Sequence, residues 1–166
     1  MSGSAGRSRS SGLRRSAARL AAVQALYQIE MSGTATETVI GEFLDHRLKE
    51  EVDGVRLDDA DRRMLRELVA GIAREAAMLD DMLSAVLEDD WPVERLETLL
   101  RLVLRAGAFE LCERPDIPPR VVITEYVDLA AAFFGGKEPG MVNGVLDRLA
   151  RSLRPEVFAT ASHGAV

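Results

Sequence analysis

Residues 96–114 read LETLLRLVLRAGAFELCER, and this segment gives the clearest indication of the architecture. Apolar residues recur in it at helical spacing and occupy several sides of the helix that they predict. A helix that is apolar on several sides is buried, so we expect this one to be the central helix of the core. The proline-rich PDIPP motif that follows ends it, because proline has no amide hydrogen to continue the helical hydrogen bonds.

Helical spacing continues on both sides of the central segment. Between residues 64 and 87 the apolar residues keep a 3–4 spacing, which predicts either one kinked helix or two, with Gly71 as the weak point. After the central helix, Pro118 and Pro119 suit the first turn of another helix. The MVNGVLDRLARSL segment at 141–153 predicts a further one.

The N-terminal half predicts two more helices, one in residues 13–33 and one after a GTATE turn, where Thr34 and Glu37 fit a capping box. An acidic loop is expected at 50–61, where Asp58 or Asp59 can cap the next helix. No segment shows sustained alternation with period two, as half-buried strands require. We therefore predict an all-α fold of about seven helices packed as bundles, either as one domain or as two small sub-bundles.

Both ends of the chain differ from this pattern. Residues 1–12 are Ser, Gly and Arg with almost nothing to bury, so we expect a disordered leader. We expect one all-helical domain over 13–154 and a flexible tail over 155–166. No apolar segment reaches the roughly 20 residues that span a bilayer, and no signal-peptide core precedes the first helix. These features predict a cytoplasmic protein without membrane contact.

Residues that typically carry catalysis or bind metals are scarce. His46 and His163 are far apart, and no cluster of Cys and His exists. Cys112 lies in an apolar run, and we interpret it as a small core residue. The GGKEPG loop at 135–140 lacks the spacing of a phosphate-binding loop, and no serine lies in a nucleophile elbow. We therefore expect no catalytic residue, no bound metal and no cofactor.

Positive charge is concentrated at the N-terminus of an acidic chain. Residues 1–29 contain five arginines and no acid, which leaves −11 on the remainder of a chain whose formal net charge is −6. A single-sign segment acts on partners through its local field. One interpretation is a solubilising tail. The other is an arginine-rich arm that becomes ordered on a phosphate backbone.

An aromatic residue follows the basic residues along the first helix. Arg15, Arg19, Val23 and Tyr27 are spaced four apart and so lie on one side of the helix. Arginine binds phosphate and an exposed ring can stack on a base, a combination typical of single-stranded RNA binding. The alternative is that Tyr27 is an ordinary core aromatic residue.

Three stretches, in order and in register, resemble the NusB transcription-antitermination family. RRSAARLAAVQALYQIEMSG resembles its N-terminal helix, and RELVAGIAREAAMLDDMLSAVL resembles its third and fourth helical segments. The L-R-x-x-x-x-E-L, D-I-P and V-N-G-V-L-D patterns resemble its C-terminal half. The resemblance covers about residues 13–154. It implies two three-helix bundles plus an extra helix, and a protein without enzymatic activity.

The resemblance also implies partners. Members of the family bind boxA-type RNA together with a small ribosomal-subunit protein also called NusE. This complex helps to assemble an antitermination machine on transcribing RNA polymerase, notably during ribosomal RNA synthesis. We expect the same of this chain, in a bacterial cytoplasm. An apolar binding face could also pair with itself, which would give a homodimer in the free state.

The matching positions imply roles for individual residues. The RNA-binding positions carried over from the family are Arg14, Arg15, Arg19, Gln24, Tyr27, Arg101, Met141 and Asn143. Met141 stands where many members have phenylalanine, and its thioether can still pack on a base. Asn143 is open to a second interpretation, in which it and Gly144 begin and pack the last helix. Arg105 and Glu110 either join the interface with the ribosomal protein or form buried capping or ionic contacts.

Two alternatives for the function remain open. The chain could be a helical protein-interaction module whose basic tail is incidental. It could also be an RNA-recruiting domain related to those fused to RNA cytosine methyltransferases, although it has no glycine-rich strand–helix unit for a methyl donor. Titration with a boxA-type RNA, with and without the ribosomal protein, separates the first alternative from RNA binding.

Overall fold

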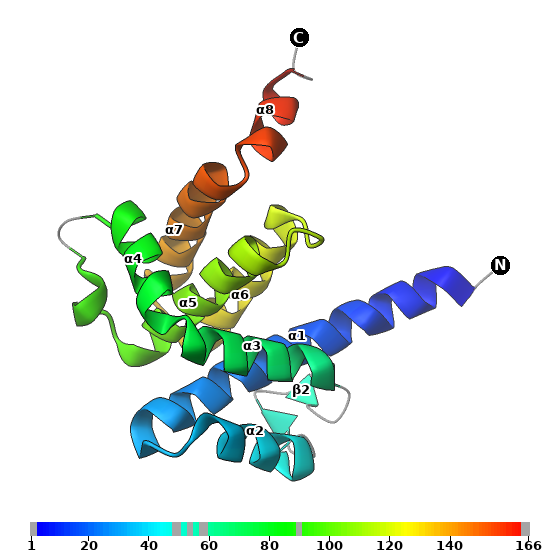
Figure 1. Cartoon of the computed structure of the whole chain (residues 1–166). Helices are drawn as coiled ribbons and strands as arrows, with labels where there is room; N and C mark the ends of the chain where they lie inside the picture. The colour runs from blue at the N-terminus through cyan, green and yellow to red at the C-terminus, as the bar shows by residue number, and fades with distance from the viewer. Residues whose placement is uncertain (1–2, 48–50, 53–54, 57–59, 89–90, 164–166) are drawn as a thin grey trace. The chain divides into compact units, whose positions relative to one another are not determined.

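Helices dominate the computed structural model, which describes residues 3–47, 51–52, 55–56, 60–88 and 91–163. Its α-helices are α1 (Gly3–Ser32), α2 (Thr36–Asp45), α3 (Arg62–Arg74), α4 (Ala76–Val86), α5 (Thr98–Glu113), α6 (Pro119–Phe133), α7 (Glu138–Leu153) and α8 (Pro155–His163) (Figure 1). A 3₁₀ turn, η2, covers Val93–Arg95. Strands β1 (Glu51–Val52) and β2 (Val55–Arg56) pair antiparallel within the expected acidic loop. The all-α prediction is confirmed, and no described helix is long and apolar enough to cross a bilayer.

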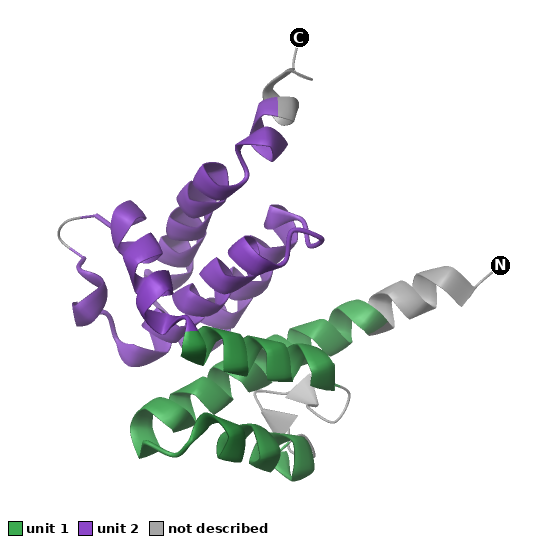
Figure 2. Ribbon diagram, in the orientation of Figure 1, with its two compact units in different colours: residues 1–74 green, residues 75–166 purple. Residues whose placement is uncertain are grey.

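The chain divides into two compact units, residues 1–74 and 75–166 (Figure 2). In unit 1, helices α1, α2 and α3 all pack on one another. Val39, Ile40 and Phe43 form the buried side of α2 at successive spacings of one and three residues, and each is at most 1% exposed. Burial of this apolar side against α1 and α3 is what stabilises a helix of only ten residues.

Neither α2 nor α3 is capped by the residues that the sequence suggests, as far as the described residues show. The capping box at Thr34 and Glu37 is wrong, because α2 starts after Ala35 and no side chain caps it. The positions predicted to cap α3 lie at 58–59, outside the described residues. Asp61 caps α3 instead, since its Oδ1 accepts a hydrogen bond from the backbone N–H of Met64 at 3.0 Å.

Unit 2 is built around α5, as the sequence predicts. Ten of the 16 residues of α5 are buried, and the helix packs against α4, α6 and α7. Helices α5, α6 and α7 contact one another pairwise, and α4 packs on α5 and α7 as the additional helix. A Cβ at Gly107 would lie 2.6 Å from a methyl carbon of Leu146, so glycine is what allows α5 and α7 to approach so closely.

The long apolar run between residues 64 and 87 forms two helices. The break falls at Glu75, whose φ of −98° and ψ of 14° lie outside the α-helical range. Gly71, the predicted weak point, is instead a buried residue inside α3. Glu75 is also the first residue of unit 2, so the break separates the two units.

The side chain of Arg154 donates hydrogen bonds to backbone carbonyl groups at the C-terminal end of α5. The carbonyl oxygen of Leu111 lies four residues before Pro115, which has no amide hydrogen to donate. Arg154 donates to this oxygen from Nε at 3.0 Å and from Nη2 at 2.9 Å. Its Nη1 donates to the carbonyl oxygen of Ile117 at 2.6 Å. Arg154 is only 6% exposed, and its guanidinium supplies the donors that the proline lacks.

Both chain ends are more helical than the sequence suggests. Helix α1 begins at Gly3, so it includes most of the 1–12 segment that we expected to be a disordered leader. The expected flexible tail over 155–166 contains α8, which starts with Pro155 at its first helical position. The guanidinium carbon of Arg151 lies 4.5 Å from the centroid of the Phe158 ring, which ties α8 to α7.

Candidate nucleic-acid interface

Helix α1 has a buried middle segment with exposed residues on either side of it. Every residue from 17 to 23 is buried, whereas residues 11–14 are exposed. Tyr27 is 39% exposed and Met31 is 56% exposed, near the C-terminal end of the helix. The alternative that Tyr27 is a core aromatic is therefore wrong, and its ring is available for stacking.

The predicted phosphate-binding arginines do not share one environment. Arg14 is exposed and Arg15 is half-buried. Arg19 is only 2% exposed, so the expectation that it reaches a phosphate is wrong in this structure. The backbone carbonyl of Arg14 accepts a hydrogen bond from the N–H of Asp61 at 3.0 Å, which ties this part of α1 to the residue that caps α3.

The geometry of the helix explains this difference. At about 100° per residue, a spacing of four turns the side-chain direction by about 40° at each step. The line from Arg15 through Arg19 and Val23 to Tyr27 therefore winds around the helix. Along this line Arg19 is buried, Val23 is fully buried, and Tyr27 is exposed again. Arg15 and Tyr27 are about 18 Å apart along the helix axis, at about 1.5 Å per residue.

Gln24 and Tyr27 lie on one side of α1, together with two residues that the sequence analysis missed. The residues at this i, i+3, i+4, i+7 spacing are Gln24, Tyr27, Gln28 and Met31. Gln24 and Gln28 are half-buried, and the amide of Gln28 donates to Glu42 on α2 at 3.0 Å. The recurrence of partly polar residues at this spacing is the signal that could have identified the whole side.

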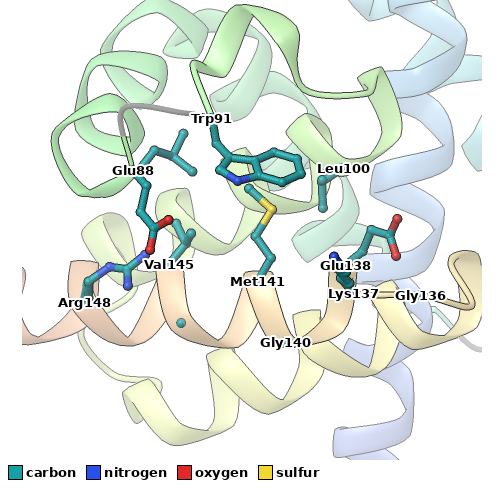
Figure 3. Close-up of a pocket in the computed structure, with 12 residues that line it drawn as sticks. Glu88, Trp91, Leu100, Gly136, Lys137, Glu138, Gly140, Met141, Val145 and Arg148 are labelled. Atoms are coloured by element: carbon teal, nitrogen blue, oxygen red, sulfur yellow. The ribbon is translucent and has the colours of Figure 1, made fainter.

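In unit 2, Met141 lines a cavity of about 620 Å³ (Figure 3). Trp91 faces Met141 across this cavity, and Leu100 and Val145 form other parts of its wall. Trp91 is 50% exposed although it is large and apolar. No motif in the sequence marked Trp91 as part of a site, so this cavity was not predicted.

The other expected RNA-binding residues of unit 2 lie on two helices. Arg101 is half-buried in the first turn of α5. Asn143 is exposed on α7. Since α7 begins at Glu138, the interpretation that Asn143 starts this helix is wrong.

Arg105 and Glu110 both make polar contacts with other side chains of unit 2. Arg105 donates from Nε and Nη2 to the two carboxylate oxygens of Asp80, at 2.7 Å each, so α5 is tied to α4 by a bidentate ion pair. Glu110 is fully buried and accepts a hydrogen bond from the hydroxyl of Tyr126 on α6. This supports the ionic or buried interpretation of both residues over a role in a partner interface.

Cys112 was predicted to be a core residue, and this is wrong. It lies in the last turn of α5 with its side chain exposed, next to the buried Leu111. Partial burial, together with the nearby carboxylate of Glu113, raises the pKa of its thiol. A raised pKa disfavours the nucleophilic thiolate.

Comparison with known proteins agrees with this architecture. The chain matches the family model described as the NusB family over residues 16–151. It is 49% identical to the transcription antitermination protein NusB of Sinorhizobium fredii, over 86% of this chain and 89% of that protein. The protein of the same name from Rhizobium etli is 48% identical over the same shares of the two chains.

Solved structures give the same result for the fold. NusB from T. maritima superposes with a TM-score of 0.61 at 30% identity, over 82% of this chain and 90% of that one. A chain from a complex of the antitermination factors NusB and NusE with double-stranded RNA gives a TM-score of 0.69 at 24% identity, over 84% of this chain and 97% of that one. With a family match over most of its length and relatives close to half identical, this chain belongs to the NusB family.

Proposed function

We propose that this chain is a transcription antitermination factor that binds boxA-type single-stranded RNA together with the ribosomal protein NusE, and so supports ribosomal RNA transcription on RNA polymerase. The accessible ring of Tyr27 within the VQALY segment carries this proposal. An exposed aromatic residue on an arginine-bearing helix suits single-stranded RNA, because the ring stacks on a base while the cations bind phosphates. The names of the relatives agree with this role.

Within the site we assign the phosphate contacts to Arg14 and Arg15, and the base contact to Tyr27 with Gln24 beside it. Because the first and last of these residues are separated by about 20 Å along α1, the RNA segment between them must be longer than a dinucleotide. Arg101, Met141 and Asn143 are proposed as further RNA contacts in unit 2. No catalytic residue is part of this proposal.

The salt dependence of RNA binding tests the assignment of the arginines. With about four phosphate contacts, the slope of log K against log salt is expected to be about −3, at roughly −0.7 per contact on a single strand. The double substitution Arg14→Ala and Arg15→Ala should reduce the slope to about −1.5. Arg63→Ala is the matched control, because Arg63 has a side chain 90% exposed on α3 and pairs with Glu67 of the same helix. An unchanged slope in the double variant would remove Arg14 and Arg15 from the RNA site.

Protein partners are tested separately. Adding NusE should tighten RNA binding, because a second protein adds contact surface and restricts the path of the RNA. A chain that binds NusE but has no affinity for RNA in either condition would instead be a protein-interaction module. Sedimentation of the free chain across a range of concentrations tests whether it forms a homodimer.

A further inference from the structure

Unit 2 has another cavity, at the C-terminal ends of α5 and α7. Its volume of about 460 Å³ lies within the roughly 300–1,000 Å³ typical of binding pockets. We call it the α8 groove, and the lining residues that matter below are Cys112, Pro115, Pro119, Leu153, Glu156 and Val157. Arg101 and Met141 lie in the first turns of the same two helices, so the groove is separate from the proposed RNA contacts.

Large apolar side chains are exposed on one wall of the α8 groove. Leu153 is the last residue of α7 and is 36% exposed, and Val157 on α8 is 45% exposed. Helix α8 has only nine residues, and a helix of that length is marginal in water by itself. Exposed apolar side chains beside a concave surface are typical of a site for a partner, whose packing would also stabilise α8.

The backbone around the α8 groove offers little to a peptide main chain. Pro115, Pro118 and Pro119 line the groove and have no N–H to donate. The carbonyl oxygen of Leu111 already accepts two hydrogen bonds from Arg154, at 3.0 and 2.9 Å. An extended peptide that binds through main-chain hydrogen bonds is therefore disfavoured. A helix satisfies its own backbone and binds a groove through apolar side chains, so it fits better.

Negative charge dominates at the α8 groove. Burial raises the pKa of the Cys112 thiol, and the carboxylates of Glu113 and Glu75 raise it further, so their field reaches the groove. Among the described residues, the charged groups that line the groove, pair with a lining residue or act on this thiol are Glu75, Glu113, Asp116, Glu156, Arg114 and Arg154. Four carboxylates against two guanidinium groups leave a formal excess of two negative charges. Arg154 is 6% exposed and donates to backbone carbonyl groups, so a ligand meets mainly the carboxylates.

We propose that the α8 groove binds a basic amphipathic helix of a partner protein. The apolar side of that helix packs on Leu153 and Val157, and its lysine or arginine side chains lie near the carboxylates, since complementary charge selects the partner. This inference does not depend on RNA binding, because the proposed RNA contacts lie on α1 and in the first halves of α5 and α7. RNA and the basic helix can therefore bind at the same time.

Cys112 is the only cysteine in the chain, so its alkylation reports on the α8 groove. The probe is a labelled model peptide built from a repeated Leu-Lys-Lys-Leu-Leu-Lys-Leu unit, which forms an amphipathic basic helix. Two matched peptides replace every lysine by glutamate or every leucine by glutamine. Anisotropy of the label measures binding to the full-length chain, and iodoacetamide at fixed pH measures access to the thiol. The basic peptide should bind saturably and slow alkylation, and both matched peptides should bind at least about tenfold more weakly.

Two variants, each with a matched control, locate the contact. Val157→Ser should weaken binding of the basic peptide about 3- to 10-fold, because it removes apolar surface that the peptide covers. Val121→Ser is its control, since Val121 is 44% exposed on α6 and is not among the described residues that line the groove. Glu156→Gln should weaken binding about 2- to 5-fold and reduce its salt dependence, as expected for an exposed charge. Asp128→Asn, at an exposed position of α6, is the control for this change.

The outcomes separate this inference from the alternatives. Equal affinity for the three peptides, or a bound basic peptide that leaves the alkylation rate of Cys112 unchanged, refutes the proposal without any substitution. If the free chain is an oligomer that Val157→Ser dissociates and Val121→Ser does not, a second copy covers the groove and the proposal is wrong. RNA affinity should be the same in all four variants. Failure of the peptide to bind leaves the proposed RNA-binding function intact, and loss of RNA binding in Val157→Ser would contradict the separation of the two sites.

Discussion

Replacing Arg154 by methionine should destabilise the protein more than any other single change to a charged residue discussed above. Methionine preserves the apolar stem but removes every donor. Arg154 also donates to the carbonyl oxygens of Glu110, at 3.2 Å, and Arg114, at 2.9 Å. Both of these oxygens keep a backbone hydrogen bond in the variant, from the N–H of Arg114 at 2.9 Å and from that of Ile117 at 3.1 Å. The carbonyl oxygens of Leu111 and Ile117 are the ones that lose their donors.

The expected magnitude follows from those two carbonyl groups. A buried polar group left without a partner costs about 1–3 kcal/mol, and contacts from a charged donor lie at the upper end. Two such groups predict a loss of about 3–5 kcal/mol in the free energy of unfolding. For a chain of this size, about 2–4 °C per kcal/mol converts this to a melting temperature lower by roughly 6–20 °C.

Urea unfolding followed by circular dichroism measures this loss directly. Arg120→Met is the control, because Arg120 is exposed at the start of α6 and surface changes are usually within about 0.5 kcal/mol. Arg154→Lys should recover only part of the stability, since an ammonium group cannot reproduce the planar fork of donors. A difference of less than about 1 kcal/mol between Arg154→Met and the control would refute the view that this guanidinium closes α5.

Three further predictions concern other positions. Tyr126→Phe removes the hydroxyl that donates to the buried Glu110 and should cost about 1–3 kcal/mol in urea unfolding; a cost below about 0.5 kcal/mol would contradict a structural role for the pair. Because its pKa is raised, Cys112 should react with iodoacetamide with a midpoint at higher pH than a free cysteine; a lower midpoint would contradict the assigned cause. Tyr27→Asp should lower RNA affinity with little change in helicity or melting temperature, since the ring is partly exposed; unfolding of this variant would mean that the ring is a core residue.

Much of the fold follows from the apolar spacing in the sequence. The central position of α5 and the proline at the start of α6 are confirmed because the signals for them are local. The break at Glu75 is not visible in the apolar pattern, which continues across it without losing its spacing. Only the backbone angles of one residue separate α3 from α4, and these depend on how each helix packs in its own unit.

The candidate site was predicted less completely, because exposure depends on what covers each side of a helix. Spacing placed Arg19 and Tyr27 on nearby sides of α1 but could not show that the middle of α1 is covered all round. Cys112 was misassigned for the same reason, since it follows a buried leucine in the final turn, where one side of α5 is left uncovered. The cavity at Trp91 was missed because its wall comes from three separate segments of the chain.

The most direct test of the account is the affinity of the purified chain for labelled single-stranded boxA-type RNA, measured at two salt concentrations with and without NusE. We expect saturable binding that weakens steeply as salt increases, because arginine–phosphate contacts release counterions, and that tightens when NusE is present. Binding that is absent in all four conditions, or that is unaffected by both salt and NusE, would contradict it.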